Sequence, residues 1–242
     1  MREAKWNGQL MIGLVGRGGL HHADLLVRSV CRAAPEVASI CAVSNGSTRT
    51  VYGAAYLEEK LGLHAFRVYP ETFFQPNTRT AEKLYESIVA LCALTGQERV
   101  LGLYCGTGPI EISLAPFVRE VVGVDSEADN ISAAAENCEI NNIRNCTFYR
   151  SAAEKVQTAG IREPFDVVVV DPPRSGLAPG VPQFIAAAGI PRCVYVSCNP
   201  STLARDLKRL HEYGYEPARI LSFDFFPHGA HVEALVLLEK PS

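Results

Sequence analysis

The chain has 242 residues, of which 48% are hydrophobic, so it can form one large domain or one domain with a smaller one. The formal net charge of −3 excludes the strongly basic composition of many nucleic-acid-binding proteins, although a local basic groove remains compatible with it. No apolar run approaches the roughly 18 residues that cross a membrane, and Met1 to Leu10 lacks the apolar core of a signal peptide.

Cysteine spacing indicates the redox compartment. The eight cysteines include no C-x-x-C pair, which argues against a zinc site and against a disulfide framework. Free cysteines are typical of a reducing environment, so we expect a cytoplasmic protein that holds no metal.

Residues 1–72 predict a small α+β subdomain. It is too small to be stable alone, so we expect it to lean on the chain that follows. Asn45-Gly46 is a strong hairpin turn signal between two of its strands. The expected elements are a helix over Ala23–Ala33 and strands over Gln9–Val15, Val37–Val43, Thr48–Tyr56 and Leu63–Tyr69.

The segment from Pro70 to Asn77 allows two interpretations. Asn77 or Thr78 can cap the next helix, with the preceding aromatic residues as a hydrophobic staple. Alternatively, Gln75 points its amide, both a donor and an acceptor, into a pocket.

Residues 73–242 alternate helix and strand regularly, which predicts a mostly parallel sheet covered on both faces. The expected helices are Ala81–Leu94, Pro109–Ala115, Glu127–Asn141, Pro182–Ala188 and Ser201–Tyr213. The expected strands are Arg99–Tyr104, Glu120–Val124, Cys146–Arg150, Phe165–Val170, Arg192–Ser197, Arg219–Phe225 and His231–Leu238.

A nucleoside site is predicted where the first strand of this second domain enters the turn Cys105-Gly106-Thr107-Gly108. Glycines let a ligand approach the backbone, and Asp125, which follows the next strand, can accept hydrogen bonds from ribose hydroxyls. Glu111 stands where the dinucleotide fingerprint has its third glycine. This favours S-adenosylmethionine as the cofactor over NAD, which stays open as an alternative.

Cys198 follows the apolar strand residues Val194, Tyr195 and Val196, and Pro200 can open a helix just after it. The carboxyl end of a strand in an open α/β sheet is where such folds keep their chemistry. A buried structural cysteine is the simpler interpretation, because free cysteines are often buried.

An antiparallel last strand beside Arg192–Ser197 would bring His231 and Glu233 to the same rim as Cys198. A thiol and a carboxylate there could act as nucleophile and base. Flanking Val232 and Ala234 would partly desolvate Glu233 and raise its pKa. The alternative for Glu233 is an ordinary exposed strand residue.

With these residues assembled, the chain resembles the S-adenosylmethionine-dependent RNA 5-methyluridine methyltransferases from about Phe73 to Glu239. The resemblance lies in five motifs in order: Phe-Phe-Gln-x-Asn at Phe73, Tyr-Cys-Gly-x-Gly at Tyr104, Asp-Pro-Pro-Arg at Asp171, Ser-Cys-Asn-Pro-x-Thr-Leu-x-Arg-Asp at Ser197 and Phe-Pro-His-x-x-His-x-Glu at Phe226.

The resemblance implies a Rossmann-like class I methyltransferase fold, with a seven-stranded mixed sheet whose last strand is antiparallel. It implies that Cys198 is the nucleophile and Glu233 the base that removes the C5 proton of uridine in tRNA or ribosomal RNA. Arg174 would stabilise the thiolate or bind phosphate, His231 would orient substrate, and the target base would be flipped out of the RNA. The implied cofactor site comprises Gln75, Tyr104, Gly106, Pro109, Asp125 and Asp171.

The chain departs from the family pattern in three ways. Gly102 stands where the family usually has an acidic residue, and Pro109 replaces a small or polar one. We also expect the N-terminal RNA-binding barrel and the iron–sulfur cluster of some members to be missing, and residues 1–72 to be a shortened remnant of the central domain. We expect a monomer that binds RNA and no membrane.

Two further functions remain open. Asp-Pro-Pro also occurs in enzymes that methylate amino groups, so a C5-cytosine or other nucleobase methyltransferase is an alternative. Gly102 and the missing barrel favour a catalytically idle relative that only binds RNA or cofactor.

Overall fold

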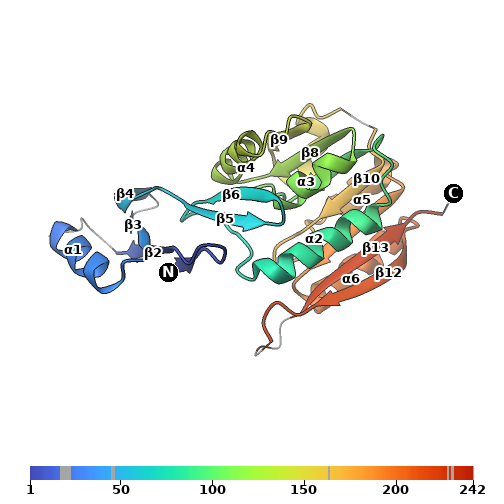
Figure 1. Ribbon diagram of the computed structural model, residues 1–242. Helices are drawn as coiled ribbons and strands as arrows, with labels where there is room; N and C mark the ends of the chain where they lie inside the picture. Colours follow the sequence, from blue (N-terminus) through green and yellow to red (C-terminus); the bar gives the residue numbers. More distant parts are fainter. Residues whose placement is uncertain (17–22, 45–46, 163, 228, 230–231, 242) are drawn as a thin grey trace. The chain divides into compact units, whose positions relative to one another are not determined.

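The computed structural model describes residues 1–16, 23–44, 47–162, 164–227, 229 and 232–241. Its chain forms two compact units, Met1–Phe74 and Gln75–Ser242, and each has its own sheet (Figure 1). In the described ranges, no helix has the length and apolar character needed to span a membrane.

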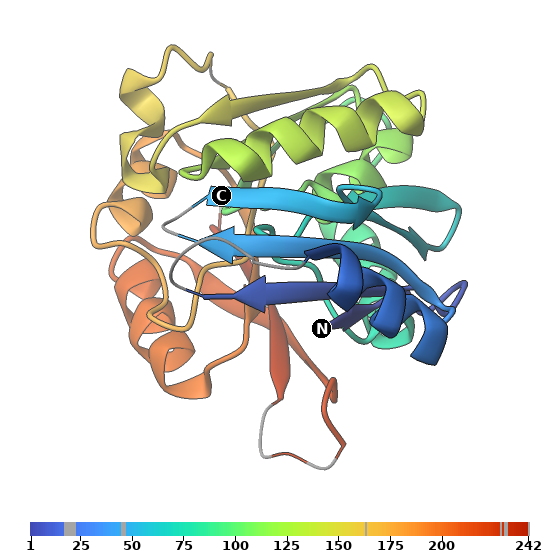
Figure 2. The same cartoon turned by 90° about the vertical axis from the view of Figure 1, so that its left-hand side faces the viewer.

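The first unit contains a four-stranded sheet in the order β1-β2-β3-β4, in which Figure 2 shows the blue strands side by side. β2 and β3 are parallel and joined through α1, whereas β3 and β4 form the predicted antiparallel pair. The predicted turn Asn45-Gly46 lies outside the described residues. The elements are β1 (Arg2–Glu3), β2 (Leu10–Val15), α1 (Ala23–Ala33), β3 (Val37–Ser44) and β4 (Ser47–Gly53).

β4 ends at Gly53, three residues before the predicted strand end. Gly53 has φ +71, and a Cβ at this position would lie 1.9 Å from the carbonyl oxygen of Ala38. The close backbone approach therefore requires glycine and ends the strand there.

A second hairpin consists of β5 (Leu57–Leu61) and β6 (His64–Val68), of which the sequence analysis predicted only β6. β5 was missed because its central residue Glu59 is charged yet faces inward with Leu57 and Leu61. The Glu59 carboxylate accepts hydrogen bonds from the backbone N–H groups of Lys5 (2.5 Å) and Trp6 (3.2 Å). These tertiary contacts satisfy the hydrogen-bonding groups of the buried carboxylate. Because the partners are distant in the sequence, the local residue pattern does not predict that Glu59 is buried.

The second unit confirms the predicted seven-stranded mixed sheet, in the order β12-β13-β11-β10-β7-β8-β9. β9, β8, β7, β10 and β11 are parallel, and β13 is antiparallel to β11. The strands are β7 (Arg99–Leu103), β8 (Glu120–Asp125), β9 (Cys146–Arg150), β10 (Val167–Val170), β11 (Arg192–Ser197), β12 (Glu216–Phe223) and β13 (Glu233–Glu239). The helices are α2 (Thr78–Cys92), α3 (Pro109–Leu114), η1 (Ala115–Phe117), α4 (Ala128–Ile140), η2 (Ala153–Thr158), α5 (Val181–Ala187) and α6 (Pro200–His211).

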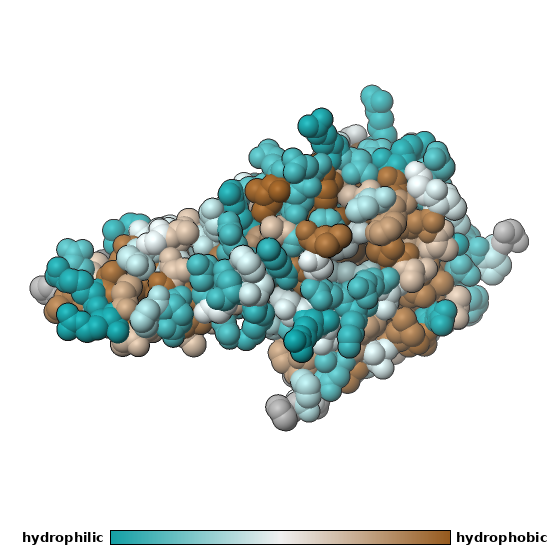
Figure 3. Space-filling view, viewed as in Figure 1, coloured by the Kyte–Doolittle hydropathy of each residue, from teal (hydrophilic) through white to brown (hydrophobic). Residues whose placement is uncertain are grey.

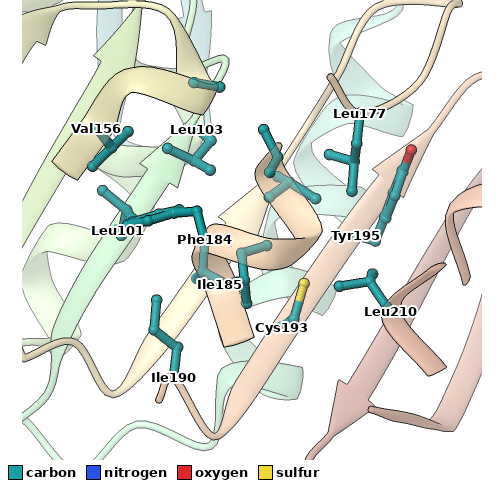
Figure 4. Close-up of a cluster of buried hydrophobic side chains, with 14 of the residues drawn as sticks. Leu101, Leu103, Val156, Leu177, Phe184, Ile185, Ile190, Cys193, Tyr195 and Leu210 are labelled. Carbon is teal, nitrogen blue, oxygen red and sulfur yellow. The ribbon is translucent and has the colours of Figure 1, made fainter. Parts of the chain in front are cut away.

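Helices cover both faces of this sheet, as predicted. α2, α3 and α4 pack on one face, and η2, α5 and α6 pack on the other (Figure 1). The four valines of β10 are buried because both faces are covered. The core on the α5 side includes Leu101, Leu103, Val156, Leu177, Phe184, Ile185, Ile190, Cys193, Tyr195 and Leu210 (Figure 4).

The closing hairpin differs from prediction at its first strand. β12 starts at Glu216, three residues before the predicted start at Arg219, and includes Pro217. β12 is the edge strand of the sheet, and an edge strand tolerates proline because its outward N–H needs no partner. The register shifts between Pro217 and Arg219, which is the local cost of the proline.

The surface of the second unit carries apolar side chains among polar ones on the face shown in Figure 3. Around the closing hairpin, Ile220 is 63% exposed, Phe226 45% and Val232 41%. Phe226 and Val232 both precede β13 in the chain.

α6 holds the loop that follows β10. Asp206 of α6 is fully buried and accepts hydrogen bonds from Tyr195 Oη (2.9 Å) and from the backbone N–H of Leu177 (2.8 Å). Arg205 and Arg209 form ion pairs with the same carboxylate, at 2.9 and 3.3 Å. The buried charge is therefore both paired and hydrogen-bonded, and it joins β11, α6 and the loop.

We expect Asp206→Ala to lower the free energy of unfolding by about 3 kcal/mol, because it leaves the buried Tyr195 hydroxyl and Leu177 N–H without an acceptor. Chemical denaturation followed by circular dichroism measures this change. Glu139→Ala on the exposed face of α4 is the control and should stay within about 0.5 kcal/mol of wild type. Equal stability of the two variants would contradict this role for Asp206.

Candidate active site

Cys198 and Glu233 are brought together by the pairing of β11 and β13. Ser197 pairs with Ala234 across the antiparallel ladder, so the next position on β11's side is Cys198 and the preceding position on β13 is Glu233. Neighbours in adjacent strands have Cβ atoms about 5 Å apart. Glu233 is half-buried at the first position of β13, and Cys198 is half-buried just beyond β11.

Three further predicted residues lie at the same edge of the sheet. Leu103 of β7 pairs with Val170 of β10, so Tyr104 and Asp171 follow adjacent strand ends. Leu103 also pairs with Val124 of β8, and Asp125 ends that strand. Since carboxyl ends of parallel strands meet at one edge, Tyr104, Asp125 and Asp171 line the rim that contains Cys198.

The Cys198 thiol has a raised pKa. The main cause is desolvation by burial, and the neighbouring carboxylates of Glu233 and Asp171 add to it. The Arg174 guanidinium opposes this rise, which indicates that it lies close enough to act on the thiol. At neutral pH the thiol is therefore protonated, and Arg174 is the cation that opposes the rise in its pKa.

Burial also raises the pKa of Glu233, and Arg174 again opposes the rise. The backbone of Arg174 is fixed, because its carbonyl accepts hydrogen bonds from Asn199 Nδ2 (3.1 Å) and Thr202 Oγ1 (3.3 Å) at the start of α6. α6 therefore positions the loop with the cation relative to the strand end with the thiol.

The turn after β7 combines a constrained tyrosine with an open glycine. Tyr104 has φ +62, an uncommon conformation for a non-glycine residue, and its hydroxyl accepts a hydrogen bond from the N–H of Ala178 (3.1 Å). Gly106 has φ +54, and a Cβ there would meet nothing within 4 Å, so a ligand can approach its backbone. Pro109 is the first residue of α3, where its missing N–H costs nothing.

Asp125 ties the glycine turn to α4. One carboxylate oxygen accepts the N–H of Gly106 (2.9 Å), and the other accepts Glu127 N–H (2.9 Å) and Asn130 Nδ2 (3.1 Å). A carboxylate has about four acceptor positions. Three are used within the protein, which leaves one for a hydroxyl of a bound ligand.

Two predicted residues are less well placed by the structure. Gln75 is half-buried, two residues before Asn77, which caps α2 by accepting the N–H of Thr80 (3.2 Å). The capping interpretation of this segment is thus confirmed, and a role for Gln75 stays a prediction. His231 lies outside the described residues. Among the described residues, no group of three or more His, Cys, Asp or Glu is arranged to hold a metal ion.

Two acidic residues near this edge were not predicted from the sequence as part of the site. Asp206 holds the Arg174 loop, and Glu111 of α3 is 2% exposed with a pKa raised to about 8, mainly by desolvation. One sequence feature could have indicated that Glu111 is buried. It is the only charged residue of the helix Pro-Ile-Glu-Ile-Ser-Leu, and it lies nine residues after a glycine within a strand.

We expect Glu233→Gln to speed the alkylation of Cys198 by iodoacetamide at pH 7.5 severalfold. Removing the neighbouring negative charge lowers the pKa of the thiol and increases the thiolate, which is the reactive form. Arg174→Ala should slow the reaction, because a cation that lowers the pKa is lost. Mass spectrometry of the Cys198 peptide measures both rates.

Glu212→Gln, at the exposed end of α6, is the control for this experiment and should leave the rate unchanged. Identical rates in wild type, Glu233→Gln and Arg174→Ala would contradict the electrostatic account of Cys198.

The chain is similar to RNA methyltransferases over most of its length. An uncharacterised RNA methyltransferase from Chlamydia muridarum is 37% identical over 199 residues, which cover 81% of this chain and 50% of the relative. Another from Halalkalibacterium halodurans is 35% identical over 252 residues, covering 98% of this chain and 55% of the relative. The chain thus spans about half the length of the curated relatives it matches.

A solved structure shares both units. The tRNA (uracil-54, C5)-methyltransferase of Pyrococcus abyssi, in complex with S-adenosyl-L-homocysteine, matches with a TM-score of 0.81 at 32% identity. The match covers 98% of this chain and 58% of that protein. The predicted Rossmann-like class I methyltransferase fold is confirmed.

The sequence pattern of the tRNA (uracil-5-)-methyltransferase family matches residues 36–241. This range includes the whole of the second unit's sheet, both residues of the thiol–carboxylate pair and the glycine turn. The chain belongs to the tRNA (uracil-5-)-methyltransferase family.

Proposed function

We propose that the protein transfers a methyl group from S-adenosylmethionine to C5 of a uridine in tRNA or ribosomal RNA, with Cys198 covalently bound to C6 during the transfer. The observation that supports this most directly is the cross-strand placement of Cys198 and Glu233 at the edge that also contains the glycine turn and Asp125. Nucleophile, base and nucleoside site thus share one rim.

The residues present fit the cofactor. The open backbone at Gly106 allows close approach, and the remaining acceptor position of Asp125 suits a ribose hydroxyl. The carboxyl groups of Glu111, Asp171 and Glu233 all have raised pKa values and suit a cation. S-adenosylmethionine supplies an electrophilic methyl group on a sulfonium cation. We assign its site to Gln75, Tyr104, Gly106, Pro109, Asp125 and Asp171.

Cys198 activates the uracil ring. C5 of uracil is a poor nucleophile until a thiolate adds to C6, which places the electron pair of the broken C5–C6 π bond in an enolate centred on C5 and O4. C5 would then take the methyl group while the bond between that group and the sulfonium sulfur breaks, so that sulfur keeps the electron pair and the neutral thioether S-adenosylhomocysteine remains. Arg174 opposes the rise in the thiol pKa, so it favours the thiolate needed for addition.

Glu233 completes the reaction as a base. After transfer, C5 holds both a hydrogen and the new methyl group, and the thiolate can leave only when that hydrogen is removed as a proton. The carboxylate of Glu233 takes the proton, the C5–C6 double bond re-forms, and the C6–S bond breaks. A raised pKa makes Glu233 a stronger base than an exposed glutamate.

RNA binding fits the surface next to the catalytic pair. Phe226 and Val232 are exposed close to Glu233 in the sequence, and single-stranded bases stack on exposed aromatic side chains. Arg174 is exposed and suits a phosphate group. We retain His231 as a substrate-orienting residue and residues 1–72 as a part of the family's central domain.

RNA that contains 5-fluorouridine should form a covalent adduct with the protein in the presence of S-adenosylmethionine. Fluorine at C5 cannot be removed as a proton, so the reaction stops with Cys198 still bonded to C6. A band of lower mobility on a denaturing gel detects the adduct.

Cys198→Ala should abolish that band, and Cys31→Ala, a half-buried cysteine of α1, should leave it unchanged. An adduct that persists in Cys198→Ala would show that another residue is the nucleophile.

Glu233→Gln should slow release of methylated RNA by at least about 100-fold, the usual contribution of a general base. The slowed step follows methyl transfer, so the variant should accumulate a covalent complex with ordinary uridine-containing RNA. Glu239→Gln, at the exposed far end of the same strand, is the matched control. A Glu233→Gln protein that turns over at the wild-type rate would remove this residue from the mechanism.

A further inference from the structure

The side chain of Glu111 occupies the space that Gly102 leaves empty. A Cβ at Gly102 would lie 2.0 Å from Glu111 Oε1 and 2.9 Å from its Cδ. No residue other than glycine fits at position 102 while the carboxyl group of Glu111 is there. The second unit thus has a buried acid against the middle of β7, and it comes from α3.

This position faces the catalytic side of the sheet. Strand side chains alternate between faces, and Leu101 and Leu103 point into the α5-side core, so Gly102 faces α2, α3 and α4. Ala234 and Val236 pack on the α5 side, so Glu233 faces the same side as Gly102. Glu111 and Glu233 therefore lie on one face. Burial raises the pKa of Tyr85 on α2, and the carboxyl groups of Asp171, Glu111 and Glu233 add to this rise.

Within the described part of the chain, none of the main contributions to the pKa of Glu111 comes from a positive charge. Its pKa of about 8 results first from desolvation, against which its own backbone N–H acts, and then from Asp171, Cys138 and Asp125. The titratable groups near it are Tyr85 of α2, Cys105 after β7, Asp125 of β8, Cys138 of α4, Cys146 of β9 and Asp171 after β10. Side chains of these types are neutral when protonated and negative when deprotonated, so none of them can carry a positive charge.

One oxygen of Glu111 also lacks a partner. Oε2 is buried and makes no hydrogen bond within the described part of the chain. A buried carboxyl without a counter-charge is costly, and proteins retain such groups mainly at functional sites. What Glu111 lacks is a cation, and the nearby glycine turn is the proposed site of a cationic cofactor.

We propose that Glu111 is the buried counter-charge through which this site prefers S-adenosylmethionine to its product, S-adenosylhomocysteine. The inference rests on the proposed function. The two molecules share their amino, carboxylate and nucleoside groups and differ in one methyl group and one positive charge at sulfur. Only the sulfonium form gains from a negative charge nearby, and water exclusion strengthens that attraction.

The preference should depend on pH with a definite sign. A bound sulfonium stabilises the ionised carboxyl, so the pKa of Glu111 falls on binding from its value of about 8. Between the bound and free pKa values, binding releases a proton and affinity increases with pH. The sulfonium charge also lowers the pKa of the amino group of S-adenosylmethionine relative to that of S-adenosylhomocysteine. This contribution is the same in wild type and in Glu111→Gln, so the comparison of the two proteins isolates the contribution of Glu111.

Isothermal titration calorimetry with each molecule at pH 6.5 and pH 8.5 tests this inference. In wild type, the affinity ratio of S-adenosylmethionine to S-adenosylhomocysteine should rise by at least about threefold between these pH values. Glu111→Gln keeps the shape but cannot ionise. It should show a smaller rise, because only Asp171, whose pKa is about 7, and the amino group of the ligand still titrate. Glu139→Gln, an exposed acid on α4, is the matched control and should keep the wild-type ratio.

A second pair of variants separates the position of the acid from the helix that supplies it. Gly102→Asp alone should destabilise the protein, because its Cβ would collide with Glu111. Combining Gly102→Asp with Glu111→Ala removes the collision and returns an acid to the same space from β7. This double variant should regain the pH-dependent preference that Glu111→Ala alone has lost.

The outcomes separate the two proposals. Wild type that binds neither molecule would overturn the proposed cofactor. Wild type that binds both, with a ratio that responds to pH equally in Glu111→Gln, would overturn the role of Glu111 and leave the proposed function standing. Circular dichroism must show that Glu111→Gln is folded before its affinities are compared with those of wild type. If Glu111→Gln does not fold, the double variant Gly102→Asp with Glu111→Ala provides the same test.

Discussion

The antiparallel pairing of β13 with β11 is the constraint on which the site depends. It places the first residue of one strand beside the residue that follows the other, so Glu233 and Cys198 meet without any loop to position them. A slip of one residue would turn every side chain of β13 to the opposite face. Both faces of β13 are buried, so the slip would turn Glu233 into the α5-side core and away from Cys198. The register of this strand therefore fixes the proposed catalytic pair.

The loops at this edge are held together by polar contacts to α6. Asp206 binds the loop after β10 through Leu177, the Arg174 carbonyl binds Asn199 and Thr202, and the Tyr104 hydroxyl accepts the N–H of Ala178. Glycine turn, cation and nucleophile thus belong to one connected network. Pre-organisation of this kind is what nucleophilic catalysis requires, because reacting atoms must be held near attack geometry before the reaction starts.

The sequence predicted features that depend on local patterns and missed those that depend on distant contacts. Apolar strands alternating with helices gave the sheet, and the strand that ends at Cys198 was predicted with its observed bounds, Arg192–Ser197. β5 was missed because Glu59 is buried by contacts to Lys5 and Trp6 more than fifty positions away. Glu111 was passed over because only the packing of α3 against Gly102 shows where its carboxyl group lies.

The charge balance links the two halves of the proposed mechanism. Burial, and after it the carboxyl groups of Glu233 and Asp171, raise the pKa of Cys198 and so keep the thiol protonated in the free protein. A cation bound among these groups offsets their negative charge and lowers the pKa of the thiol, by the Coulomb attraction that would stabilise ionised Glu111. Cofactor binding would then favour the thiolate. Transfer of the methyl group would remove the positive charge, and the thiolate would no longer be stabilised by it. In the proposed mechanism, the Cys198 thiol is therefore most reactive when the methyl donor is bound, and it returns to its protonated, less reactive form after the thiolate has left C6.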